Sequence, residues 1–175
     1  IKPDITLIGK ILGGGLPISA IGISSKIYKK IQKLKTKIFF GGTFSGNTFS
    51  VLAGNNTINY IKKNTKMVNN LIKKCEFFEN KVNHFIIKNN IDAKVYQFDT
   101  IMRIVFSKNK VNNRIQRDFF ERKKTNNKKN FIKFLRKKNI LYPRNGVILL
   151  SLANNMNDLN YIIGNICIGL KKNFS

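Results

Sequence analysis

The chain has 175 residues and a mass of 20.1 kDa, enough for one substantial domain or for a domain with an appendage. Its hydrophobic fraction of 42%, with 14 Phe, excludes wholesale disorder. No uninterrupted apolar stretch approaches the roughly 18 residues that span a bilayer, which excludes a membrane-embedded protein. Two cysteines, Cys75 and Cys167, are too few for a disulfide scaffold or a zinc cluster. Because the first residue is Ile1 rather than Met, we expect a piece of a longer protein.

The formal net charge is +25, which raises the question of a nucleic-acid partner. The basic residues are 27 Lys against only 6 Arg, and the chain also holds 25 Asn and 26 Ile. Lys, Asn and Ile share A/T-rich codons, whereas selection for phosphate clamps would favour the planar fork of Arg. The lysines are spread along the chain, apart from one dense stretch at 122–129. We therefore expect a solvated basic surface, and a basic nucleic-acid-binding module without catalysis remains an alternative.

The first third of the chain is rich in glycine and has an α/β pattern. The expected elements are, in chain order, strands at 3–8 and 16–23, a helix from Ser24 or Ser25 to Leu34, a glycine-rich loop at 39–47 and a helix that opens at Thr48 or Ser50.

A long amphipathic helix follows, and a domain boundary is expected in or just before it, near Lys66. Its apolar residues recur at three- and four-residue steps: Met67, Val68, Leu71, Ile72, Cys75, Phe78, Val82, Phe85 and Ile86. Beyond it the sequence predicts strands at 91–98, 101–106 and 147–152, a basic helical stretch at 114–138, and a last helix at 157–171 with Asp158 in its first turn. This alternation is typical of a small α/β domain.

Most residue types that carry chemistry are absent or isolated. His84 is the only histidine and cannot form a metal site alone, so we expect a partly buried structural role. Cys75 and Cys167 fall on apolar helix faces and are poor nucleophile candidates. The sequence has no Ser-His-Asp order and no phosphate-binding GxxxxGKS motif, and its eight acidic residues leave little for carboxylate chemistry.

Lys10 is the exception, because it follows an apolar strand and precedes three glycines in LIGKILGGGLP. The glycines allow backbone angles that other residues avoid and let a flat ligand approach the chain. A lysine held among Ile8, Ile11 and Leu12 would be partly desolvated, which favours the neutral, nucleophilic amine that Schiff-base chemistry requires. A surface lysine at a strand end is the alternative interpretation of this pattern.

The second candidate segment is the loop GGTFSGN, which contains Thr43 and Ser45. Its glycines expose backbone N–H groups, and its hydroxyls can bind an anion such as phosphate. Glycine- and serine-rich turns without ligands are common, so the loop alone is weak evidence.

Together the strings PDITLIGKILGGGLPISAIG and GGTFSGNTFSVLAG resemble the class III pyridoxal-phosphate-dependent aminotransferases, closest to the glutamate-1-semialdehyde 2,1-aminomutase subgroup. The resemblance implies that Lys10 forms the aldimine with pyridoxal 5'-phosphate and that Thr43 contacts the cofactor phosphate of the neighbouring subunit. The segment LYPRNGVILLSLANNMNDLNYI is more loosely similar to the family's C-terminal strand and helix.

This resemblance implies an α/β fold of the pyridoxal-phosphate-dependent transferase type, similar to aspartate aminotransferase. Residues 1–65 would be the C-terminal part of the large cofactor-binding domain, and residues 66–175 the long connecting helix and the small C-terminal domain. It further implies a cytoplasmic homodimer with a shared active site, acting on small amino and keto compounds. A nucleic-acid partner is not favoured, for the compositional reasons given above, and no membrane partner is expected. The activity would be transamination or, alternatively, the aminomutase reaction that makes 5-aminolevulinate for tetrapyrroles. An inactive, truncated remnant is a further alternative.

Three segments depart from the family pattern. Thr48 stands where the family has proline, and Asn154-Asn155 replaces the usual His-Thr. The Phe-Glu-Ala motif of the aminomutases has no clear counterpart around 144–146, which favours a general transaminase over the aminomutase. The family's phosphate-binding loop, its ring-stacking aromatic residue and its pyridine-binding aspartate would all precede Ile1.

Overall fold

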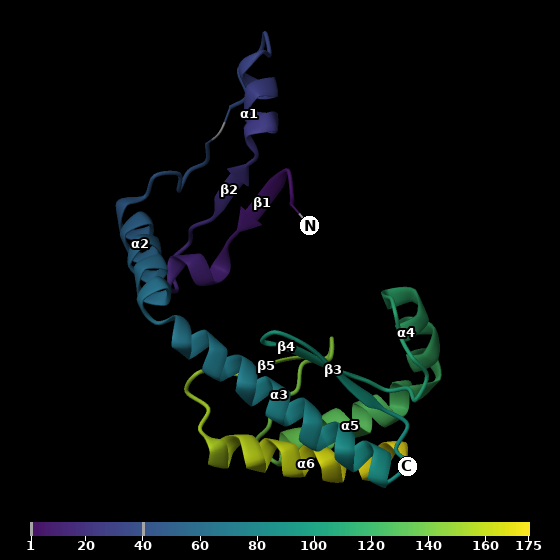
Figure 1. The fold of residues 1–175 in the computed structure, drawn as a ribbon. Coiled ribbons are helices and arrows are strands. Elements are labelled where there is room, and N and C mark those ends of the chain that lie inside the picture. Colours follow the sequence, from purple (N-terminus) through teal and green to yellow (C-terminus); the bar gives the residue numbers. More distant parts are fainter. Residues whose placement is uncertain (1, 40) are drawn as a thin grey trace. The chain divides into compact units, whose positions relative to one another are not determined.

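The computed structural model describes residues 2–39 and 41–175, which form two compact units, Ile1–Thr65 and Lys66–Ser175. Both contain helices and strands, so the expected α/β class is confirmed (Figure 1). Within the described residues, no helix is both long enough and apolar enough to cross a membrane.

The first unit contains a two-stranded antiparallel sheet. Strand β1 (Ile5–Ile8) pairs with β2 (Ala20–Ile23), with Ile5 opposite Ile23 and Ile8 opposite Ala20. A 3-10 helix, η1 (Lys10–Gly13), directly follows β1. Both strands are exposed along their whole length. The strands are shorter than the predicted runs because their first residues do not join the ladder.

Two helices complete the first unit. Helix α1 (Ser25–Gln32) begins after Ser24, whose hydroxyl accepts the N–H of Ile27 at 3.3 Å, as the predicted cap requires. Helix α2 (Thr48–Lys63) begins after Asn47, whose side chain accepts the N–H of Ser50 at 3.0 Å.

The second unit contains a three-stranded antiparallel sheet in the order β3-β4-β5. Its strands are β3 (Lys94–Phe98), β4 (Ile101–Val105) and β5 (Val147–Leu149). Val95 lies opposite Ile104, and Met102 opposite Ile148, so these four buried side chains share one face of the sheet. That face supplies part of the core.

Three helices provide most of the remaining core of the second unit: α3 (Thr65–Lys88), α5 (Thr125–Lys137) and α6 (Met156–Phe174). Helix α4 (Arg114–Glu121) and the 3-10 helix η2 (Arg122–Lys124) contribute no residue to the core cluster of the described chain. Figure 1 shows α3, α5 and α6 running together along the sheet. Their buried side chains include Phe78, Val82, Phe131, Leu135, Leu159 and Leu170. The predicted long helix and last helix are thus confirmed.

Asparagine side chains join α3 to the sheet and cap the first turns of α4 and α6. The Asn83 side chain on α3 accepts the N–H of Val95 at 2.8 Å and donates to its carbonyl at 3.0 Å, which ties the helix to β3. Helix α4 begins after Asn113, whose side chain accepts the N–H of Gln116 at 3.0 Å. Helix α6 begins with a full capping box, in which Asn155 and Asp158 each accept the other's backbone N–H, at 2.9 and 3.0 Å.

Candidate functional site

Lys10 is placed where β1 ends. Gly9 is fully extended, and the chain then turns sharply at Lys10, whose φ of 53° lies in the left-handed region that non-glycine residues seldom adopt. Strained backbone of this kind is often found at functional positions, where the surrounding structure holds it.

The partial burial that the sequence predicted for Lys10 is wrong for this chain, because its side chain is exposed. Of the three apolar neighbours, only Leu12 is buried, whereas Ile8 is 47% and Ile11 72% exposed. The physical reason is that, among the described residues, no layer covers the sheet of β1 and β2. The amine therefore lies in water rather than in an apolar pocket.

The glycines after Lys10 allow η1 to lie against α2. A Cβ on Gly14, whose φ is 57°, would come within 2.6 Å of the Thr57 hydroxyl, and a Cβ on Gly54 would lie 3.3 Å from the Leu12 carbonyl. Larger side chains at these positions would push the two elements apart. The glycines thus hold the segment of Lys10 close to α2.

Thr43 lies in the turn before α2 and lines an open hollow of about 680 Å³. The hollow is formed by the segments 17–19, 42–47 and 50–51, and the hydroxyl-bearing residues that line it are Ser19, Thr43, Ser45 and Ser50. Gly46 adopts a positive φ of 72°, which lets the turn close onto Asn47, the cap of α2. Ser19 was not a predicted member, because it is distant in sequence and carries no motif of its own.

Lys10 does not line the hollow that contains Thr43. The structure therefore does not bring the two predicted site residues together within one chain. A single chain presents two separate half-sites: an exposed amine after β1, and a hollow that is lined by four hydroxyl-bearing residues and by the N-terminus of α2.

The histidine and the two cysteines of the chain do not contribute to either half-site. His84 is exposed on α3, so the expectation that it is partly buried is wrong; it falls on the helix face opposite the core. Cys75 and Cys167 are buried, as expected, and burial raises the pKa of the Cys167 thiol to about 11 and that of Cys75 above its usual value. Within residues 2–39 and 41–175, no group of three potential metal ligands is found.

Two departures from the family pattern have simple structural consequences. Thr48 is the first residue of α2, where proline is favoured because its missing N–H is not needed and its fixed φ suits a helix. Asn155 is the N-cap of α6, a position that asparagine and threonine both fill well. Both substitutions preserve the helix start.

Comparison with known proteins identifies the family. The family model described as aminotransferase class-III matches residues 1–142. The chain belongs to the class III aminotransferase family. It is 32% identical over 111 residues to the glutamate-1-semialdehyde 2,1-aminomutase of Alkaliphilus metalliredigens. The matched residues are 63% of this chain and 25% of that protein. It is 30% identical over 179 residues to the aminomutase of Methanosphaera stadtmanae, covering 97% of this chain and 39% of that protein.

Solved structures share the fold at lower identity. The chain superposes on a glutamate-1-semialdehyde aminomutase variant from Pseudomonas aeruginosa, in complex with PMP, with a TM-score of 0.84 and 17% identity over 99% of this chain and 40% of that one. An omega-transaminase from Sphaerobacter thermophilus matches with a TM-score of 0.76 and 18% identity, over 97% of this chain and 39% of that one. The predicted aminotransferase fold is therefore confirmed. The chain spans about a quarter to two fifths of the length of these relatives.

Proposed function

We propose that this chain is the lysine-bearing portion of a pyridoxal-phosphate-dependent enzyme that transfers amino groups. Residues 1–65 would be the C-terminal part of the large cofactor-binding domain, and residues 66–175 the connecting helix and the small domain. The observation that carries the proposal is the Lys10 motif, with its strained turn and glycines, inside a chain of the class III aminotransferase family.

The residues present fit the cofactor's two ends. Lys10 offers an accessible primary amine to an aldehyde, and the hollow of Thr43 offers hydroxyls and turn N–H groups to a phosphate. When bound, pyridoxal phosphate supplies an aldehyde that condenses with amines and a ring that delocalises negative charge. The remaining groups that hold the ring would come from outside the described residues.

Each residue then has a distinct role. The Lys10 amine would hold the cofactor in the resting enzyme and, once displaced by the amino substrate, would move the proton at the substrate's α-carbon. The Thr43 hydroxyl would donate a hydrogen bond to the phosphate. Because Lys10 and the Thr43 hollow are separate within one chain, we propose that they meet across a homodimer interface.

Substitution of Lys10 tests this proposal. In the protein as its natural source makes it, borohydride reduction in the presence of pyridoxal phosphate should attach a pyridoxyl group to Lys10, found by peptide mass mapping. Lys10→Ala should remove that adduct, the cofactor's absorbance band and at least about 10³-fold of turnover, since a nucleophile is lost. Lys26→Ala, at an exposed position of α1, is the matched control and should retain all three. Turnover and an absorbance band that persist in Lys10→Ala would contradict the proposal.

A second candidate is the aminomutase, which moves an amino group within one molecule. It is favoured by the names of the curated relatives, which include glutamate-1-semialdehyde 2,1-aminomutases at 30% to 37% identity. Incubation with glutamate-1-semialdehyde and no keto acid separates the two activities. Formation of 5-aminolevulinate would favour the aminomutase, whereas turnover only after addition of a keto acid would favour a general transaminase.

A further inference from the structure

A basic hollow of about 440 Å³ lies beside α5 in the second unit. It is lined by five cationic side chains, one apolar side chain and one hydroxyl side chain: Thr125, Lys128, Lys129, Ile132, Lys133 and Arg136 from α5, and Arg144 from the loop before β5. Among the described residues, no Asp or Glu lines it. The hollow thus gathers like charges that would repel one another in the absence of a counter-charge.

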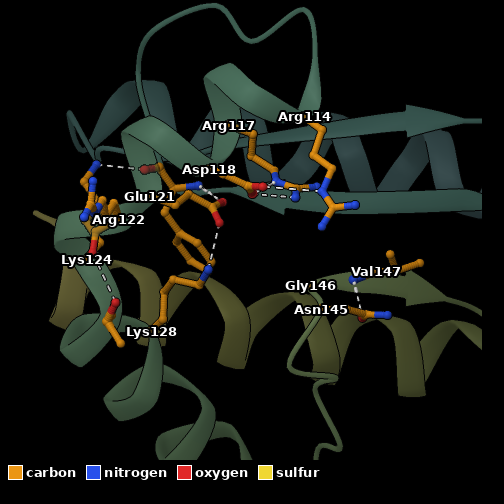
Figure 2. Close-up of polar contacts among 12 residues, drawn as sticks. Arg114, Arg117, Asp118, Glu121, Arg122, Lys124, Lys128, Asn145, Gly146 and Val147 are labelled. Carbon is orange, nitrogen blue, oxygen red and sulfur yellow. Dashed lines mark hydrogen bonds and ion pairs between the residues drawn. The ribbon is translucent and has the colours of Figure 1, made fainter.

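One of the five cations is already neutralised. The Lys128 ammonium lies 2.7 Å from the Glu121 carboxylate, which is buried and also accepts the backbone N–H of Phe106 at 3.1 Å (Figure 2). In the part of the chain that the structure describes, no ion pair involves Lys129, Lys133, Arg136 or Arg144. About four positive charges of the hollow are therefore uncompensated.

The fold holds these charges on one side of α5. Lys129, Lys133 and Arg136 follow one another at four- and three-residue steps, and so lie on one helix face. Phe131 and Leu135 are fully buried, which fixes the rotation of the helix. Arg144 comes from a separate segment, so the cations converge on the hollow from two directions.

A neighbouring arginine adds to the positive charge beside the basic hollow. A small inner hollow shares Lys128, Ile132 and Arg144 with the basic hollow and is also lined by Arg103 and Glu121. The Nε atom of Arg103 is buried and has no hydrogen-bond partner among the described residues. Burial without a partner is costly for a charged group, and it also holds the pKa of Arg103 below its ordinary value.

We propose that the basic hollow binds a compact ligand that carries two or more phosphate groups, such as a nucleoside polyphosphate. Two or more phosphates supply the several negative charges that the uncompensated cations require. The volume exceeds what the phosphates need and leaves room for an organic group against Ile132 and the lysine stems. A single-stranded nucleic acid is less favoured, because no aromatic residue lines the hollow to stack on its bases.

Calorimetric titration of the 175-residue chain with inorganic tripolyphosphate tests the proposal. We expect saturable binding with a stoichiometry of one. The double variant Lys133→Glu/Arg136→Glu should weaken that binding at least about tenfold, because it reverses two of the four free charges. The control Lys29→Glu/Lys30→Glu changes the net charge equally at two exposed positions of α1, and should alter the affinity less than about twofold.

Three results would overturn the proposal. An equal loss of affinity in the two double variants would show that only net charge matters. Absence of saturable binding up to about 1 mM tripolyphosphate would show that the hollow has no such ligand. Binding of a single-stranded oligonucleotide that tripolyphosphate does not displace, with loss in the α5 variant, would assign the surface to nucleic acid instead. The variant Lys133→Gln/Arg136→Gln removes the two charges without reversing them. If it melts like the unmodified chain by circular dichroism but binds tripolyphosphate more weakly, the loss of affinity comes from lost charge and not from lost folding.

Discussion

Two glycines of α6 show how strongly the effect of one residue depends on what lies beside it. A Cβ on Gly169 would approach the rings of Phe131 and Phe134 at 2.9 to 3.0 Å, whereas a Cβ on Gly164 would have nothing within 4 Å. Gly169 therefore permits close packing of α6 against α5, and Gly164 serves no comparable purpose in this chain.

Alanine substitution at these two positions should change stability in opposite directions. Gly164→Ala should stabilise the second unit by about 0.5–1 kcal/mol, because alanine favours the helix more than glycine does. Gly169→Ala should destabilise it by about 1–3 kcal/mol, because the rings must shift. Urea unfolding followed by circular dichroism measures both. A destabilising Gly164→Ala would mean that this face of α6 is covered in solution.

The sequence located individual residues better than it located their surroundings. The motif around Lys10 was visible because glycines and a lysine in that order are distinctive. The exposure of Lys10 and His84 was not, because burial depends on layers that come from distant segments. For the same reason Ser19 could not be joined to Thr43 before the fold was known.

At the scale of elements, helix starts were predictable because their signals are local. The capping box of α6 involves only Asn155 and Asp158, three residues apart. The end of β5 was less predictable. The apolar run continues to Leu152, but Asn154 accepts the N–H of Ser151 and donates to its carbonyl, and this turn ends the strand at Leu149.

The cap of α6 can be tested against threonine, the residue that the resemblance described above places at this position. Asn155→Ala should lower the free energy of unfolding by about 1 kcal/mol, because the N–H of Asp158 loses its acceptor. Asn155→Thr should lower it by less than about 0.5 kcal/mol, since threonine also caps. Asn157→Ala, at an exposed position inside the first turn, is the control. Equal losses for Asn155→Ala and Asn157→Ala in denaturant titrations would contradict a capping role.

At the scale of the whole molecule, apolar burial is unevenly divided. The main core cluster is drawn entirely from the second unit, from Cys75 to Phe174. In the first unit Leu7 is 74% exposed and Phe49 76%, and among its described residues, 2–39 and 41–65, only Leu12 is a buried large apolar residue. Because burial of apolar surface is the main stabilising force, the second unit should be far more stable than the first.

Limited proteolysis of the full chain measures this difference. Trypsin should cleave first within residues 1–65 and leave fragments that begin near Lys66, although lysines are spread along the whole chain. Mass spectrometry identifies the surviving fragments. The same digestion in denaturant should show no such preference, and equal early cleavage of both units under native conditions would refute the expected difference in stability.

Several asparagines of this A/T-biased sequence occupy positions where asparagine stabilises the fold. Asn47, Asn113 and Asn155 begin three of the helices, and Asn90 and Asn139 adopt left-handed backbone angles. These are the positions where asparagine is among the best residues available. Drift towards A/T-rich codons can therefore accumulate asparagine at such sites without loss of architecture, so the fold can outlast extensive change in its own composition.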